Sequence, residues 1–165
     1  MAVGAQRDQW WIGHHRGVAG VDLVDETFVV VEPHTLAAIV ADPAKWTQWW
    51  PDLQLAVFMD RGVLGQRWSM TGALVGSLEI WIEPVADGCI VHHYLRGEPS
   101  ADGRTPDPWP DTPAGWRRAA KERARRAKAW KRTIWALKRD LEGDRVAGAP
   151  PAWATATDTA SAPPQ

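Results

Sequence analysis

Apolar and small side chains recur every three or four positions between residues 114 and 142, and no Pro or Gly interrupts that segment after Gly115. Residues at this spacing fall on one face of an α-helix. Pro113 stands where a helix can begin, and Gly143 stands where one usually ends. We therefore predict a long helix over 114–142 with one buried stripe, formed by Trp116, Ala120, Ala124, Ala127, Trp130, Ile134, Leu137 and Leu141.

The two halves of this predicted helix differ in what they can bury. The second half carries large apolar side chains, each worth roughly 1.5 to 3 kcal/mol when fully buried, whereas the first half offers mostly alanines. At about 1.5 Å per residue the helix is roughly 43 Å long, while an eight-residue strand spans only about 26 Å. We expect the second half to anchor the helix and the first half to extend past the sheet.

Shorter segments upstream alternate apolar and polar positions with a period of two, which predicts strands. The first covers 22–32, ends in the β-branched run 28–31 and closes at Pro33. Turn signals such as Asp60-Arg61-Gly62, the segment 72–76 and Asp87-Gly88 separate the others. The resulting antiparallel meander contains the predicted strands 53–59, 66–71, 78–83 and 89–96.

Two other segments connect these elements. Residues 34–50 predict a helix with Thr35 as its cap, broken in two by Asp42-Pro43 and ended by Pro51. Residues 97–113 contain five prolines and predict a surface loop. The fold class is therefore α+β: a curved antiparallel sheet of about five strands packed on a long C-terminal helix, with a short broken helix after the first strand.

Length and composition predict one globular domain over residues 21–143 of the 165-residue chain. Residues 1–20 lack periodicity and predict a flexible leader, and residues 144–165, rich in Ala, Pro, Thr and Ser, predict a disordered tail. His14 and His15 in the leader are more typical of solvated side chains than of metal ligands. Twelve tryptophans are present; we expect seven in a core or pocket wall (Trp46, Trp49, Trp50, Trp68, Trp81, Trp130, Trp135), while Trp10, Trp11, Trp109 and Trp153 have no predicted role.

The single cysteine, Cys89, excludes an internal disulfide and a Cys-based zinc cluster, and we expect no cofactor. The sequence shows no apolar run long enough to span a bilayer and no signal peptide, so we expect a cytoplasmic protein. Fourteen Arg against five Lys, with abundant Ala, is typical of a GC-rich bacterial genome.

The near-neutral net charge of −1 hides a strong asymmetry. Residues 114–142 contain eleven Lys or Arg and three acidic residues, a net charge of +8, which leaves −9 on the rest of the chain. The simpler interpretation is a solvated basic face that complements an acidic body. The alternative is an interaction surface for anionic membranes, formed by Arg117, Lys121, Arg125, Lys128 and Arg132; no aromatic platform for bases accompanies it, so nucleic acid is disfavoured.

The order of elements, with the pattern Asp-Pro-x-x-Trp-x-x-Trp over 42–49, the strand end at Glu32-Pro33 and the segment Gly88-Cys89-Ile90-Val91, resembles the polyketide cyclase/dehydrase and lipid-transport family of the START-related (SRPBCC, helix-grip) superfamily. The resemblance covers residues 21 to 142. It implies a cavity between the sheet and the C-terminal helix that receives a small hydrophobic or lipid-like molecule. Relatives usually have six or seven strands, whereas five are predicted here. Either the cavity is small and open on one side, or a second subunit covers the missing edge in a homodimer.

No P-loop, dinucleotide glycine motif, nucleophile elbow or HExxH motif is present. Our first hypothesis is therefore binding of an apolar ligand, and the predicted ligand-binding residues are Trp46, Trp49, Trp50, Trp68, Met70, Leu78, Ile80, Ile82, Val91, His93, Trp130, Ile134 and Leu137. A second hypothesis is a cyclase or dehydratase in which His92 or His93 acts with Glu79 in acid/base catalysis. The opposing interpretation is that Leu78, Ile80 and Ile82 face inward, which would put Glu79 in solvent.

Overall fold

The computed structural model describes residues 20–151 and 153. Residues 1–19 of the predicted leader and most of the predicted tail lie outside these residues, as do His14, His15, Trp10 and Trp11. Among the helices that the structure describes, none is both long and apolar enough to cross a membrane.

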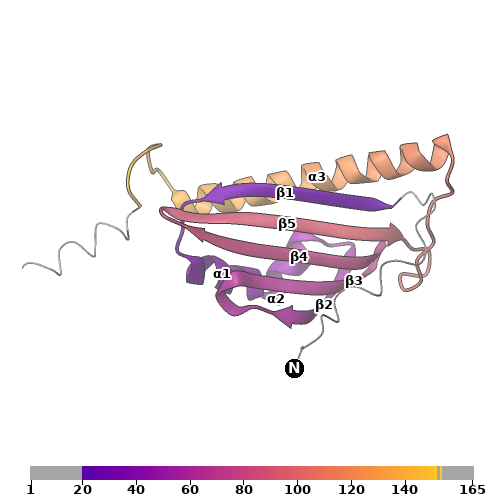
Figure 1. Cartoon of the computed structure of the whole chain (residues 1–165), viewed down its shortest axis with the longest axis horizontal. Coiled ribbons are helices and arrows are strands. Elements are labelled where there is room, and N and C mark those ends of the chain that lie inside the picture. Colours follow the sequence, from indigo (N-terminus) through magenta and orange to yellow (C-terminus); the bar gives the residue numbers. More distant parts are fainter. Residues whose placement is uncertain (1–19, 152, 154–165) are drawn as a thin grey trace, which may run out of the picture.

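The core of the fold is one antiparallel sheet in the order β1-β5-β4-β3-β2 (Figure 1). Each strand after β1 is hydrogen-bonded to the next along the chain, as the predicted meander requires, and β1 pairs with β5 to complete the sheet. The strands are β1 (Val21–Val29), β2 (Leu53–Asp60), β3 (Gly65–Gly72), β4 (Leu74–Val85) and β5 (Gly88–Pro99).

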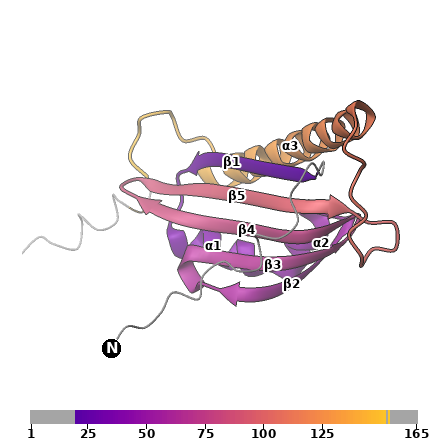
Figure 2. The ribbon, with the colours of Figure 1, turned by 45° about the vertical axis from the view of Figure 1, so that its right-hand side comes forward.

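The α-helices labelled in Figures 1 and 2 lie on one face of this sheet, which we call the inner face. The long helix α3 (Pro113–Glu142) runs along β1. On the same face, α1 (Pro33–Ala41) packs against β3 and β4, and α2 (Pro43–Trp49) packs against β2. The break between α1 and α2 falls at Asp42, as predicted, and the Asp42 side chain accepts a hydrogen bond of 2.9 Å from the backbone N–H of Ala44. A short 3₁₀ helix, η1 (Gly62–Leu64), connects β2 to β3.

Alternation along the strands decides which side chains enter the core. Leu78, Ile80 and Ile82 of β4 are buried on the inner face, and Cys89, Val91, His93 and Leu95 do the same on β5. The second half of α3 contributes Trp130 and Ile134, which are buried in the same cluster. This half anchors the helix, and its N-terminal end reaches beyond β1 (Figure 1).

In the first half of α3, the buried residues lie one position earlier in the sequence than the predicted stripe. Gly115 and Ala119 are buried, whereas Trp116, Ala120 and Ala124 are exposed. The helix starts against the preceding loop, where a Cβ on Gly115 would overlap the carbonyl oxygen of Pro110.

Three tryptophans lie in places that differ from the prediction. Trp135, expected in a wall, is 59% exposed on the outward side of α3, and Trp81 lies on the outer face of β4. Trp109, which had no predicted role, packs against the core. The hydrophobic pattern of a short segment does not show whether an aromatic side chain faces the core or lies on an outer surface beside other side chains.

Several element ends also differ from the prediction. The first strand ends at Val29 rather than residue 32, and the helix after it starts at Pro33, so Thr35 is not its cap. The expected turn over 72–76 is shorter because β4 begins at Leu74, and β5 continues to Pro99 into the expected loop. Gly76 lies opposite Gly97, where a Cβ would overlap the carbonyl oxygen of Arg96, so this glycine permits close strand approach rather than a turn.

Candidate functional site

A cavity of about 180 Å³ lies between α3, the end of α2 and the inner faces of β1 and β5. We call it the Trp–His cavity. One side is apolar and aromatic, and the other is charged. It is lined by Leu23, Trp49, Trp50, Pro51, Asp52, His93, Leu95, Arg125, Arg126, Ala129 and Trp130.

Three parallel rings form the aromatic side of the Trp–His cavity. The His93 ring stacks on Trp130 with centroids 4.2 Å apart, and Trp50 stacks on both rings at 5.9 Å and 5.7 Å. Trp49 meets the edge of this group in a T-shaped contact with Trp130. Stacked aromatic rings are rigid, so the cavity has a flat, preformed wall.

The imidazole of His93 is fully buried, and neither of its ring nitrogens has a hydrogen-bond partner among the described residues. Burial lowers the pKa of His93 to about 3, although the negative charge of Asp25 opposes the shift. The imidazole is therefore neutral near pH 7. Asp25 itself accepts a hydrogen bond from the indole N–H of Trp130 at 3.1 Å and pairs with Lys131 at 2.6 Å.

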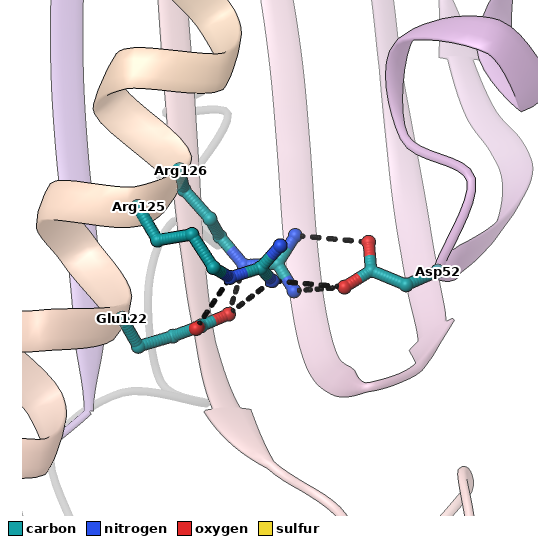
Figure 3. Close-up of polar contacts among 4 residues, drawn as sticks. All are labelled: Asp52, Glu122, Arg125 and Arg126. Carbon is teal, nitrogen blue, oxygen red and sulfur yellow. Dashed lines mark hydrogen bonds and ion pairs between the residues drawn. The ribbon is translucent and has the colours of Figure 1, made fainter.

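Asp52, Arg125 and Arg126 form the charged side of the cavity, and Glu122 pairs with both arginines (Figure 3). Arg126 donates to Asp52 at 2.8 Å and to Glu122 at 2.8 Å, and Arg125 donates to the same carboxylates at 3.0 Å and 2.7 Å. We call these four residues the Asp52 cluster. It joins α3 to the residue just before β2 and carries no net formal charge.

The charges of the Asp52 cluster support one another. Burial alone would raise the pKa of Asp52, but hydrogen bonds and positive charge from Arg126 and then Arg125 outweigh it and lower that pKa. The hydrogen bond from Arg125 is the main cause of the lowered pKa of Glu122. Both carboxyl groups are therefore ionised near pH 7 and hold both guanidinium groups in place.

Four of the predicted ligand-binding residues, Trp49, Trp50, His93 and Trp130, line the Trp–His cavity. The others lie outside its lining. Trp46 meets Trp68 edge to face with centroids 5.5 Å apart, and both pack in the core. The cavity is consequently smaller than the predicted set implied; the remaining members, buried or partly buried in the core, are Met70, Leu78, Ile80, Ile82, Val91, Ile134 and Leu137.

The three candidate catalytic residues are not brought together. His93 faces inward, whereas His92 and Glu79 lie on the outer face, as alternation on β5 and β4 requires. Glu79 is paired there with Arg61 and Arg67. The ring nitrogens of His92 lie 3.1 Å from Glu26 and 2.9 Å from Glu83, so this histidine links β5 to both neighbouring strands.

Sequence reasoning missed the contribution of Arg126 and Asp52 to the site. Arg126 is only 6% exposed. It precedes Trp130 and Ile134 by four and eight residues, so its place in their stripe was visible in the sequence. Asp52 follows Pro51 in a turn and gave no such signal. Among the described residues, no group of three potential metal ligands is present.

A scan against protein-family models and a search of curated proteins each give no match. Among solved structures, the Aha1 dimer from Colwellia psychrerythraea aligns over 76% of this chain and 99% of its own, with 12% identity and a TM-score of 0.50. This chain is also similar to a START superfamily protein from Mycobacterium smegmatis, with 16% identity over 70% of this chain and 98% of that one and a TM-score of 0.38. It is similar to Ara h 8.0201 with 13% identity over 71% of this chain and 99% of that one and a TM-score of 0.30. The five-stranded sheet, the long C-terminal helix and the likeness to Aha1 together show that this chain has the START-like helix-grip fold.

Proposed function

We propose that this protein binds a small hydrophobic molecule in the Trp–His cavity. The observation that carries the proposal is a cavity between the sheet and α3 with one side built from stacked aromatic rings. An apolar cavity of about 150 Å³ holds a benzene molecule, so a volume of about 180 Å³ suits one ring with a short substituent rather than a long acyl chain. Of the predicted ligands, this favours the small hydrophobic molecule over the lipid.

A cavity-filling variant tests this proposal. Ala129 lines the Trp–His cavity, so Ala129→Met places a larger side chain in the space without removing a wall residue. Ala124→Met is the matched control, because Ala124 is exposed on the same helix. We expect wild type and Ala124→Met to bind single-ring aromatic compounds in calorimetric titrations and Ala129→Met to lose at least tenfold in affinity. Absence of binding to wild type, or equal binding by all three proteins, would refute the proposal.

A cyclase or dehydratase activity is the alternative use of the same cavity, and the geometry supports it less well. Of the three candidate catalytic residues, His93 alone lines the cavity, and its lowered pKa makes it a weak base. Acid/base catalysis here would depend on His93 without a paired carboxylate. We therefore place binding ahead of catalysis.

The exposed side of α3 favours a second function, attachment to an anionic membrane surface. Arg117, Lys121, Lys128 and Arg132 are exposed, and no hydrogen bond or ion pair joins them to the part of the chain that the structure describes. Trp135 is exposed on the same side of the helix. Arg125 is occupied in the Asp52 cluster and contributes less than predicted. Cations beside an exposed Trp suit the interface of an anionic bilayer.

Vesicle sedimentation tests the membrane function. We expect the protein to pellet with phosphatidylserine-containing vesicles, to stay in solution with neutral vesicles, and to detach as salt is raised. Lys128→Glu with Arg132→Glu should abolish pelleting. Lys45→Glu with Arg104→Glu changes the net charge equally at a partly exposed and an exposed site off this helix, and this double variant should still pellet with the vesicles. Equal loss in both double variants would show that net charge, not this face, is responsible.

The free edge of β2 supports the predicted homodimer. Among the strands that the structure describes, β2 ends the sheet and pairs with β3 alone, and it exposes Val57, Phe58 and Met59. An unprotected apolar edge is a site of strand pairing between copies. The related Aha1 structure is described as a dimer. We expect light scattering to give a dimer mass for wild type and a monomer mass for Phe58→Lys; a monomeric wild type would end this proposal.

A further inference from the structure

The nitrogens of His93 are unpartnered for a geometric reason. An imidazole makes hydrogen bonds in the plane of its ring, and the neighbours of His93 are the indoles of Trp130 and Trp50, stacked parallel to that plane. Neither stacked ring can satisfy a nitrogen. Both nitrogens are covered by other atoms in this structure, but His93 lines the Trp–His cavity. Because buried polar groups are almost always hydrogen-bonded, a donor and an acceptor without a partner among the described residues point to a polar group that a ligand brings into the cavity.

The chemistry of His93 limits what that group can be. A neutral imidazole carries one N–H donor and one lone-pair acceptor, so it can donate to a carbonyl oxygen or accept from a hydroxyl. The rest of the lining near His93 is apolar and includes Leu23, Leu95 and Ala129. A ligand that consists of an apolar ring with one polar group therefore complements the imidazole of His93 and its apolar surroundings.

The charged side of the cavity does not call for a charged ligand. Arg125 and Arg126 are both engaged by Asp52 and Glu122, and the two positive charges balance the two negative ones. An anionic ligand would have to displace a carboxylate that already makes short hydrogen bonds with both guanidinium groups. A carboxylate or phosphate on the ligand is consequently disfavoured.

We infer that the Trp–His cavity selects a neutral single-ring compound that carries one hydroxyl or carbonyl group, which is hydrogen-bonded to His93. This inference rests on the proposed binding function and narrows it to a chemical class. His93 acts here as the specificity-determining residue, while Trp50 and Trp130 supply the surface for the ring.

Pairs of probes with equal numbers of heavy atoms test this inference by calorimetry at pH 7. Phenol and toluene differ by a hydroxyl in place of a methyl, and benzamide and benzoate differ in charge. We expect phenol to bind about tenfold more tightly than toluene, the usual net effect of one hydrogen bond. We also expect benzamide to bind more tightly than benzoate. In His93→Phe, which keeps an aromatic ring, phenol and toluene should bind equally, whereas His92→Phe on the outer face should keep the preference.

Nitrogen NMR of the wild-type protein gives a readout that does not depend on how a variant folds. Addition of phenol should shift a ring-nitrogen signal of His93 and leave those of His92 unchanged. If phenol and toluene bind equally, or if the His93 signals do not respond, the ligand class is overturned while the binding function stands. If none of the four probes binds, the binding function itself is overturned.

Discussion

Asp52→Asn isolates the Asp52 cluster without changing the size of a side chain. The carboxylate of Asp52 accepts from Arg126 at 2.8 and 3.3 Å and from Arg125 at 3.0 Å. Breaking a fully buried ion pair costs about 3 to 5 kcal/mol, whereas an exposed one contributes about 0 to 1 kcal/mol. Asp52 and Arg125 are 35% and 55% exposed, Arg126 only 6%, and Glu122 continues to hold both arginines. We therefore expect the free energy of unfolding to fall by about 2 kcal/mol.

Urea unfolding followed by circular dichroism measures this loss, and thermal melts should show it as a decrease of about 4 to 8 °C for a chain of this size. Asp107→Asn is the matched control, because Asp107 lies in an exposed loop and its side chain makes no hydrogen bond or ion pair with the described residues. We expect the control to stay within about 0.5 kcal/mol of wild type. Equal stability of Asp52→Asn and wild type would refute the view that the cluster fastens α3 to the start of β2.

Asp52→Asn also tests how the free energy of unfolding depends on pH. The pKa of Asp52 in the folded protein lies below its ordinary value of 3.8, so its ion pairs stabilise the fold fully above that pH. The stabilisation is lost as the pH falls from about 4 through the lower, folded-state pKa. An amide does not titrate, so wild type and Asp52→Asn should converge in stability below pH 4. A difference that persists unchanged at pH 2 would contradict this assignment.

Three further predictions follow from other buried groups. Ile134→Ala should lower the free energy of unfolding by about 2 to 5 kcal/mol in urea titrations, because Ile134 is 0% exposed and its truncation leaves a cavity; a loss below 1 kcal/mol would contradict its place in the core. Cys89 is buried and burial raises its pKa to about 11, so at pH 8 a disulfide reagent should label it only after urea unfolds the protein, and labelling in native buffer would count against this burial. His92→Gln should cost only about 1 kcal/mol, because its partners Glu26 and Glu83 are well exposed; a cost above 3 kcal/mol would show that this link is stronger than the geometry indicates.

The sheet was predictable because its signals are local. Alternation placed Leu78, Ile80 and Ile82 on one face, and Asp87-Gly88 marked the hairpin between β4 and β5. The break before Pro43 was equally local, since proline cannot continue a preceding helix. These features need no knowledge of what packs against them, and the structure agrees with each of them.

The site was less predictable because it depends on segments far apart in the chain. Trp46, Trp50, Trp68 and Trp130 all lie in segments with a periodic apolar pattern, yet Trp46 and Trp68 pack against each other, whereas Trp50 and Trp130 border a cavity. Nothing in their spacing distinguishes the two cases. Asp52 and Arg126 meet only because α3 returns to the sheet, at a separation of 74 positions along the chain. Pairing at that separation is not visible in one sequence without a fold to place the helix.

Arg126 explains why the cavity and the ion pairs occur at the same place. The buried stripe of α3 continues from Ile134 to Trp130 and then reaches position 126, where an apolar side chain would extend the core. The guanidinium of Arg126 must instead turn toward carboxylates, because a buried charge without partners is strongly unfavourable. It therefore pairs with Asp52 and Glu122, and Trp130 and Ile134 are the buried residues that α3 contributes to the apolar core cluster. A single arginine in an apolar stripe thus accounts both for the place where the large buried apolar side chains of α3 end and for the ion pairs on the charged side of the Trp–His cavity.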